Sequence, residues 1–172
     1  MDIRTLTPGD AEVFQSFMLS ALRELPTGFA ISYEELAAES MDSVRERLRP
    51  TEVPATRVFG AFDEAGTMAG VVSVRQQAAP LRMRHKGTVG RMYVAPAYRR
   101  LGLARRLLEA VLGYARNVDG LEQLNLIVDS RNAAAQRLYE AFGFVPFGLE
   151  PRELKVGDGY SDSVHMWMKL GE

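Results

Sequence analysis

A glycine-containing turn holds the residues of this sequence whose types and spacing best suit a chemical role. It spans residues 99–104, RRLGLA, between a strand-like run at 87–94 and a helical pattern that starts at Leu103. The first N–H groups of a helix have no partner within it, and together with the helix dipole they attract anions. Gly102 and Ala104 leave those N–H groups uncovered, and glycine can also adopt a positive φ. The pattern predicts a site for a phosphate group.

The turn alone does not identify its ligand. A Walker loop requires G-x-x-x-x-G-K-[ST] and a dinucleotide fingerprint requires G-x-G-x-x-G, whereas this turn reads R-x-x-G-x-A. A tight turn that simply needs a small residue would read the same way. The helix that follows is amphipathic, with apolar residues every three or four positions: Leu103, Leu107, Leu108, Val111, Leu112 and Ala115.

A second strand and helix follow at residues 121–144, LEQLNLIVDSRNAAAQRLYEAFGF. The apolar run through Leu124 and Val128 predicts the strand. Asn132 is a suitable N-cap for the helix, and Gly143 is the residue expected where a left-handed conformation ends it. The chain therefore repeats the order of strand, short turn and helix.

Together the two segments resemble the GNAT superfamily of acetyl-CoA-dependent N-acetyltransferases. The turn at 99–104 is similar to its pyrophosphate loop, and Asn132-x-x-Ala135-x-x-Leu138-Tyr139-x-x-x-Gly143-Phe144 is similar to its second CoA-contacting segment. The resemblance covers essentially the whole chain and is strongest from 87 to 147. It implies an α/β protein with the GNAT fold, in which helices flank a mixed, mostly antiparallel twisted sheet.

The resemblance also implies the site residues. Acetyl-CoA would be the cosubstrate, and its pantetheine arm would bond to backbone groups of the central strand where that strand splays from the next one. A phenol of ordinary pKa ~10 can protonate a departing thiolate of pKa ~8.5, so Tyr139 would be the catalytic acid. Packing is the alternative role for Tyr139, as helix capping is for Asn132. The implied cofactor-binding residues are Met92, Tyr93, Val94, Arg99, Arg100, Leu101, Gly102, Leu103, Ala104, Asn132 and Tyr139.

Charge is segregated along the chain although the formal net charge is only −1. A positive field beside a phosphate-binding turn suits a polyphosphate ligand such as CoA. Nucleic acid is the competing interpretation, which we disfavour because the basic residues are not interleaved with aromatic ones and the chain is slightly acidic. No Asp or Glu occurs between Ala65 and Leu108, and the basic residues there are Arg75, Arg82, Arg84, Lys86, Arg91, Arg99, Arg100, Arg105 and Arg106.

Length and composition favour one domain, residues 1–172, with 47% hydrophobic and 25% charged residues. Without cysteine there is no disulfide, thiolate metal site or catalytic thiol. Neither His85 nor His165 has metal-ligand spacing to an acid or a second histidine, so we expect no metal. The N-terminus does not resemble a signal peptide, and no apolar run approaches the ~20 residues of a membrane span. We therefore expect a cytoplasmic monomer or homodimer with no membrane partner.

Periodicity and turn residues predict the order β-α-α-β-β-β-α-β-α-β-β. Asp10 is expected to cap a helix to about Arg23, with Val13 on its inner face, and a capping box of Ser32 and Glu35 is expected to open one helix to about Leu48. Pro146 favours an edge or bulge position for the strand around it. The other strands are expected at 1–6, 56–62, 68–76, 87–94, 121–129, 144–147 and 164–170, with an extension of the 144–147 strand over 148–155 left open.

The general base and the acceptor are not identified by the sequence. Many members of this superfamily carry a glutamate on the central strand to take the amine proton, but this strand has no acid. Water, an acceptor that arrives neutral, or one of the carboxylates Glu34, Glu35, Glu150 and Glu153 could replace it. The acceptor is expected between the 24–35 loop and the 148–163 segment. The predicted function is acetyl transfer to a primary amine by direct attack in a ternary complex; the alternative is a CoA-sensing module of the same fold without catalysis.

Overall fold

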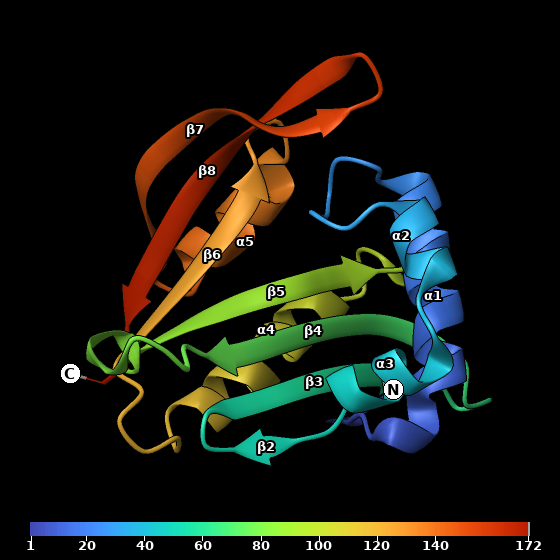
Figure 1. The fold of residues 1–172 in the computed structure, drawn as a ribbon, viewed down its shortest axis with the longest axis horizontal. Coiled ribbons are helices and arrows are strands. Elements are labelled where there is room, and N and C mark those ends of the chain that lie inside the picture. Colours follow the sequence, from blue (N-terminus) through green and yellow to red (C-terminus); the bar gives the residue numbers. More distant parts are fainter. Residues whose placement is uncertain (172) are drawn as a thin grey trace.

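A twisted eight-stranded sheet organises the protein, whose computed structural model describes residues 1–171 (Figure 1). The strands are β1 (Asp2–Thr5), β2 (Thr51–Glu52), β3 (Ala55–Phe62), β4 (Met68–Gln76), β5 (Lys86–Val94), β6 (Gln123–Asp129), β7 (Val145–Val156) and β8 (Gly159–Lys169). The α-helices are α1 (Ala11–Glu24), α2 (Tyr33–Ala38), α3 (Met41–Arg47), α4 (Leu103–Ala115) and α5 (Ala133–Ala141). None of these helices is long and apolar enough to cross a membrane.

The sheet is mixed and mostly antiparallel, as predicted. Its strands follow the order β1-β3-β4-β5-β6-β8-β7, and β2 pairs with β3. Only β5 and β6 pair in parallel, because α4 connects them as a crossover on one face of the sheet (Figure 1). This parallel junction lies at the centre of the sheet, where the candidate site forms.

Each face of the sheet has its own apolar core. The back face, away from the viewer in Figure 1, is covered by α4 and α5, and the apolar stripe predicted for 103–115 is buried there. The front face is covered by α1, α2 and α3, where Phe14, Leu36 and Val44 are almost fully buried against the sheet. Since a fully buried Leu or Phe contributes about 1.5–3 kcal/mol, both helical layers are held mainly by their apolar faces.

The front layer differs from the prediction in three places. The helix expected over 32–48 is two helices, because Glu39 is extended and Ser40 caps α3 by accepting from the Ser43 N–H at 3.2 Å. Val13 is 44% exposed, whereas Phe14 and Ala21, also predicted on the inner face of α1, are buried. The Asp10 carboxylate does not cap α1. It accepts from the Thr7 N–H at 2.8 Å and closes the 3₁₀ turn before the helix.

The C-terminal hairpin is longer than its sequence pattern suggests. The strand expected at 144–147 continues to Val156, and the last strand begins at Gly159 instead of Val164. Irregular pairing between Glu150 and Leu154 breaks the alternation of apolar residues that would mark one long strand. Pro146 does lie on an edge strand at a register shift, as predicted.

Candidate active site

The central parallel junction of the sheet opens along most of its length. The last paired positions of β5 and β6 are Thr88 and Asn125, and beyond them the strands diverge (Figure 1). The rest of β5, Val89 to Val94, has no strand partner on that side and includes Met92 and Tyr93. Unpaired backbone groups on such a strand can bond to an extended ligand as to an added strand. The splay expected from the family resemblance is therefore present.

The turn before α4 presents unpaired backbone donors. The N–H groups of residues 100–105 donate no hydrogen bond to another described residue, and the helix's first bond runs from the Arg106 N–H to the Gly102 carbonyl at 3.2 Å. Gly102 has φ +73°, and an added Cβ there would meet no atom within 4 Å. Arg100 also has a positive φ of 64°. Consecutive free N–H groups in such a turn form a concavity that binds anions.

The side chains of the turn do not all point into that concavity. Leu103 is 3% exposed and packs in the back core, so only its backbone remains available, whereas Leu101 is 69% exposed. Arg100 is exposed, and Ala104 is half-buried. The turn therefore offers backbone groups more than side chains.

The Arg99 guanidinium is bound within the protein. Its Nε donates to the Val94 carbonyl at 2.9 Å, and its Nη2 lies 2.5 Å from the Glu24 carboxylate. The Tyr93 hydroxyl donates to the same carboxylate at 2.5 Å, and burial together with this charge raises the pKa of Tyr93 to about 12. Glu24 was not a candidate from the sequence, because only the fold brings the end of α1 against β5.

The second motif places Asn132 and Tyr139 at the start and the end of α5. The Asn132 side chain accepts from the Ala135 N–H at 3.1 Å, which confirms the cap, and Gly143 has the expected positive φ, +94°. Tyr139 is 6% exposed, its ring packs edge-on against Phe144, and burial raises its pKa to about 12. Its hydroxyl bonds to no other residue within 1–171, so the phenol is protonated at neutral pH and free to donate.

A hollow of about 510 Å³ opens between the loop after α1 and the β7–β8 hairpin, the two segments expected to hold the acceptor. Glu34 lies in its wall. Glu35 is not available, because its carboxylate accepts from the Ser32 N–H at 2.7 Å in the predicted capping box. The lining residues are Leu22, Arg23, Pro26, Phe29, Ala30, Ile31, Ser32, Tyr33, Glu34, Leu154, Lys155, Val156 and Gly157.

The two remaining candidate carboxylates meet a histidine. The Nε2 atom of His165 lies 3.0 Å from Glu150 and 3.8 Å from Glu153, and one ligand atom from each residue falls within 4.8 Å of the others. The expectation that neither histidine groups with acids is wrong for His165, because the antiparallel pairing of β7 and β8 brings distant positions together. Two carboxylates and an imidazole are ligand types that a divalent cation accepts.

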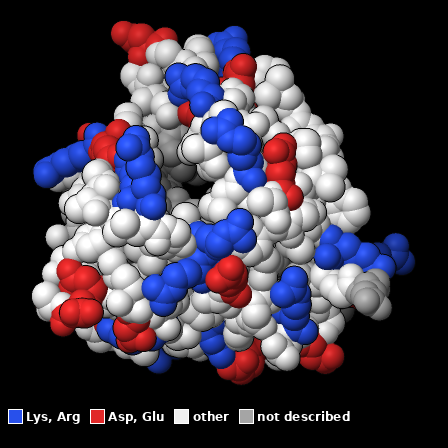
Figure 2. Space-filling model, turned by 180° about the vertical axis from the view of Figure 1, so that it is seen from behind, with Lys and Arg blue, Asp and Glu red and all other residues white. Residues whose placement is uncertain are grey.

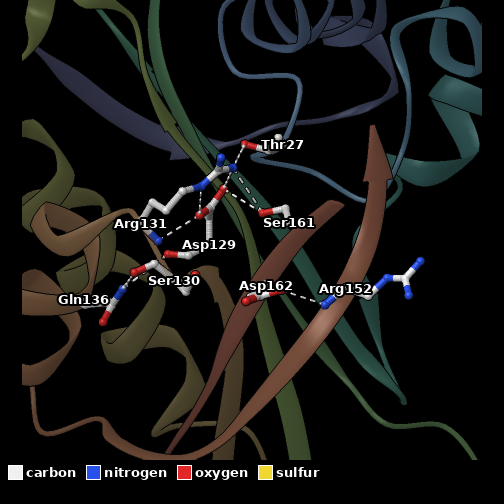
Figure 3. A network of polar contacts seen from close by, with 8 residues as sticks. All are labelled: Thr27, Asp129, Ser130, Arg131, Gln136, Arg152, Ser161 and Asp162. Atoms are coloured by element: carbon white, nitrogen blue, oxygen red, sulfur yellow. Dashed lines mark hydrogen bonds and ion pairs between the residues drawn. The ribbon is translucent and has the colours of Figure 1, made fainter. Parts of the chain in front are cut away.

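A compact polar network closes the far end of β6 (Figure 3). Arg131 donates to both carboxylate oxygens of Asp129, at 3.0 and 2.8 Å, and the Ser161 hydroxyl donates to the same carboxylate at 2.9 Å. Arg131 also reaches the Thr27 hydroxyl at 3.3 Å. These bonds hold the pKa of Asp129 far below its ordinary value, chiefly through Arg131. The network joins β6, β8 and the loop after α1, and no motif or spacing in the sequence indicates it.

The face opposite to that of Figure 1 carries many basic side chains. Figure 2 shows Lys and Arg side chains around a hollow in this surface. Arg99, Arg100, Arg105 and Arg106, at the turn and the first turn of α4, are all exposed. A positive surface around a concavity raises the local concentration of anions.

An open parallel junction, a turn of free N–H groups and a buried tyrosine together define a GNAT-type acyltransferase fold. Residues 19–144 match the model of the acetyltransferase (GNAT) family, and the chain therefore belongs to that family. A GNAT-family acetyltransferase from Streptococcus pneumoniae is 25% identical, with TM-score 0.87 over 99% of both chains. A putative acetyltransferase from Salmonella typhimurium, solved with acetyl-CoA, is 21% identical and has TM-score 0.79 over 100% of this chain and 95% of its own.

Curated relatives carry two different acceptor names. Mycothiol acetyltransferase of Thermobispora bispora is 34% identical over 86% of this chain and 48% of its own length. Spermidine N(1)-acetyltransferase of Escherichia coli is 28% identical over 59% of this chain and 52% of its own length. The chain thus spans about half the length of the curated relatives it matches.

Proposed function

We propose that residues 1–172 form one N-acetyltransferase domain that moves the acetyl group of acetyl-CoA to a primary amine in a ternary complex. The observation that carries the proposal is the row of free N–H groups at residues 100–105 next to the open length of β5. A pyrophosphate would accept from the turn, and the pantetheine arm would bond along β5. The Salmonella neighbour solved with acetyl-CoA supports this ligand.

The cofactor contacts follow from which groups are free. Backbone groups of Met92, Tyr93 and Val94 would bond to pantetheine. Residues 99–104 would contribute backbone N–H groups, with Arg100 adding charge, and Asn132 would cap α5 beside the ligand. No metal takes part in the proposed reaction. A cytoplasmic monomer or homodimer remains our expectation.

The transfer step needs little from side chains. The amine lone pair attacks the thioester carbonyl carbon while a backbone N–H near Val94 polarises the oxygen. The tetrahedral intermediate collapses with cleavage of the C–S bond, and the Tyr139 hydroxyl gives its proton to the departing sulfur. The amine's proton leaves to water or to a carboxylate of the acceptor hollow, or the amine arrives neutral.

Turnover of acetyl-CoA with a mixed panel of amines tests the proposal, together with calorimetric binding of CoA. We expect CoA binding and amine-dependent release of free CoA. CoA binding without turnover by any amine would favour the CoA-sensing alternative. Absence of CoA binding by folded protein would contradict the anion turn itself.

A further inference from the structure

Arg91 is a half-buried arginine that forms no ion pair with a carboxylate among the described residues. It lies on β5 at a bulge, where β4 pairs through Val71 with Tyr93 but through Ser73 with Gly90, and its φ is +52°. Its one side-chain hydrogen bond is long, from Nη1 to the Ser73 hydroxyl at 3.4 Å. None of its other donors is sealed from solvent. The free N–H groups therefore point into accessible space.

An unpaired, half-buried charge needs a physical explanation. Burial weakens the hydration of a charge, so native proteins usually place an opposite charge beside one that is partly withdrawn from water. Burial, and then the charges of Arg47 and Arg75, lower the pKa of Arg91 to about 10. At neutral pH the group is still charged. Glu39 is the one acid whose charge raises this pKa, and it forms no ion pair with Arg91 among the described residues.

The surroundings of Arg91 are also basic. Arg75 and Ser73 project from the same face of β4, opposite Thr88 and Gly90 of β5. Arg47 approaches from α3, which packs on this front face through the buried Val44 and Leu48. The nearby Glu39 is paired with Arg47 and does not reach Arg91. The charges that act on Arg91 are therefore two arginines and one carboxylate that is already paired with Arg47.

The position of this cluster relates it to the acceptor. Arg91 precedes Val94 by three residues on the open length of β5, a span of about 10 Å at ~3.3 Å per residue. Tyr93, two residues further along the front face, contacts Phe29 of the acceptor hollow, with 6.3 Å between ring centroids. Arg91 itself lies outside the lining of the hollow, so an acceptor would have to extend past Tyr93 along the front of β5 to meet the guanidinium.

We propose that Arg91, with Arg47 and Arg75, binds a carboxylate or phosphate group carried by the acceptor. The proposal rests on the proposed function and names its substrate class: amines that bear an anion within about 10 Å of the nitrogen, the Arg91 to Val94 span. The planar guanidinium fork suits a carboxylate or phosphate. Polyamines such as spermidine, named for one relative, would be repelled by the same charges.

The first experiment measures the anion site without acetyl-CoA or catalysis. Succinate is titrated into the protein and into Arg91→Gln by calorimetry, with Arg82→Gln, an exposed arginine on the loop after β4, as the matched control. We expect at least 10-fold weaker binding for Arg91→Gln, no change for Arg82→Gln, and an unchanged or higher unfolding temperature for Arg91→Gln. Equal succinate affinity in all three proteins would overturn the anion site.

The second experiment asks whether the anion belongs to the acceptor. Matched pairs that differ only in charge, such as 4-aminobutanoate and 4-aminobutanamide, are compared by kcat/KM. We expect at least a 10-fold preference for the carboxylate that Arg91→Gln abolishes through KM. No preference, despite Arg91-dependent succinate binding, would show a free-anion site and overturn the acceptor assignment. If no amine is acetylated while succinate binding still needs Arg91, the proposed function fails and the anion site stands.

Discussion

Asp129 and Arg91 are charged residues on the two strands that flank the opening of the sheet, and their surroundings are opposite. The Asp129 carboxylate accepts from Arg131 and Ser161 and is almost fully satisfied (Figure 3). Arg91 has one long hydrogen bond to Ser73 and two other arginines nearby. One strand carries a charge that the protein neutralises itself, and the other carries a charge that it leaves unneutralised.

The difference separates structural polar groups from groups available to ligands. The Asp129 network joins three segments, so substitution of Asp129 should lower the free energy of unfolding. Arg91 makes one long hydrogen bond, to Ser73, so substitution of Arg91 should lower the affinity for an anion and not the stability. The same distinction applies to the unbonded Tyr139 hydroxyl and to the free N–H groups of the 99–104 turn, which we place with Arg91.

Tyr139→Phe should lower kcat by roughly 10²-fold and leave CoA affinity nearly intact, because it removes one proton donor and little packing. Tyr114→Phe is the matched control, since the Tyr114 hydroxyl also has no hydrogen-bond partner but is buried on α4 beside Phe59. Steady-state kinetics and CoA calorimetry measure both variants. If Tyr139→Phe kept its turnover but bound CoA more weakly, the tyrosine would have a packing role and not a catalytic one.

Gly102→Val should weaken CoA binding by at least ~2 kcal/mol, because its side chain would stand in front of the free N–H groups. Backbone strain at positive φ is controlled with Gly120→Val, since Gly120 has φ +70° and equally open surroundings. Calorimetry on both folded variants separates strain from obstruction. Equal CoA affinity in the two would remove the argument for the anion turn.

Asp129→Asn should destabilise the protein by about 1.5 kcal/mol, because it weakens charge-assisted hydrogen bonds at a site where the side chain is 11% exposed. Asp158→Asn, in the exposed β7–β8 turn, should change stability by less than ~0.5 kcal/mol. Urea unfolding measures both. If Arg91→Gln lost as much stability as Asp129→Asn, Arg91 would be a structural residue and not one available to a ligand.

The smallest expected effect is the pH dependence of stability that the hydrogen-bonded Asp129 carboxylate causes. The pKa of Asp129 is lowered in the folded state, so its contribution is complete above the ordinary value of 3.8 and is lost as pH falls below it. By pH 3 the loss should be about 1 kcal/mol. Unfolding midpoints from pH 6 to 3 should therefore fall less steeply for Asp129→Asn than for the unsubstituted protein. Parallel pH profiles would contradict this assignment.

The cofactor side of the site was readable from sequence because it is built from local backbone geometry. A positive-φ glycine, a helix start and a capping Asn132 are each specified within a few residues, and all three are present. The strands and helices around them were predicted for the same reason, since periodicity follows neighbouring positions. The split at Ser40 was missed because a serine within a helical pattern can equally cap a new helix.

The sequence predicted the two segments that border the acceptor hollow, but not the contacts between side chains there, because these join positions far apart in the chain. Glu24 pairs with Arg99, His165 with Glu150, and Arg91 lies beside Ser73, each across many intervening residues. The bulge that turns Arg91 toward the front face depends on how β4 and β5 pair, which no spacing within one strand reveals. The absence of an acid on β5 was visible in the sequence, but the arrangement around the arginine on that strand was not.

The ion pair of Glu24 and Arg99 has a geometric consequence. Glu24 ends α1 and so begins the loop that borders the acceptor hollow, while Arg99 begins the turn of free N–H groups. One contact therefore fixes the starting points of both loops, and it also holds the end of β5 through the Val94 carbonyl. If acetyl-CoA and an acceptor bind as proposed, this ion pair would fix the distance between them, and acceptors of different length would present their amines at the same point along β5.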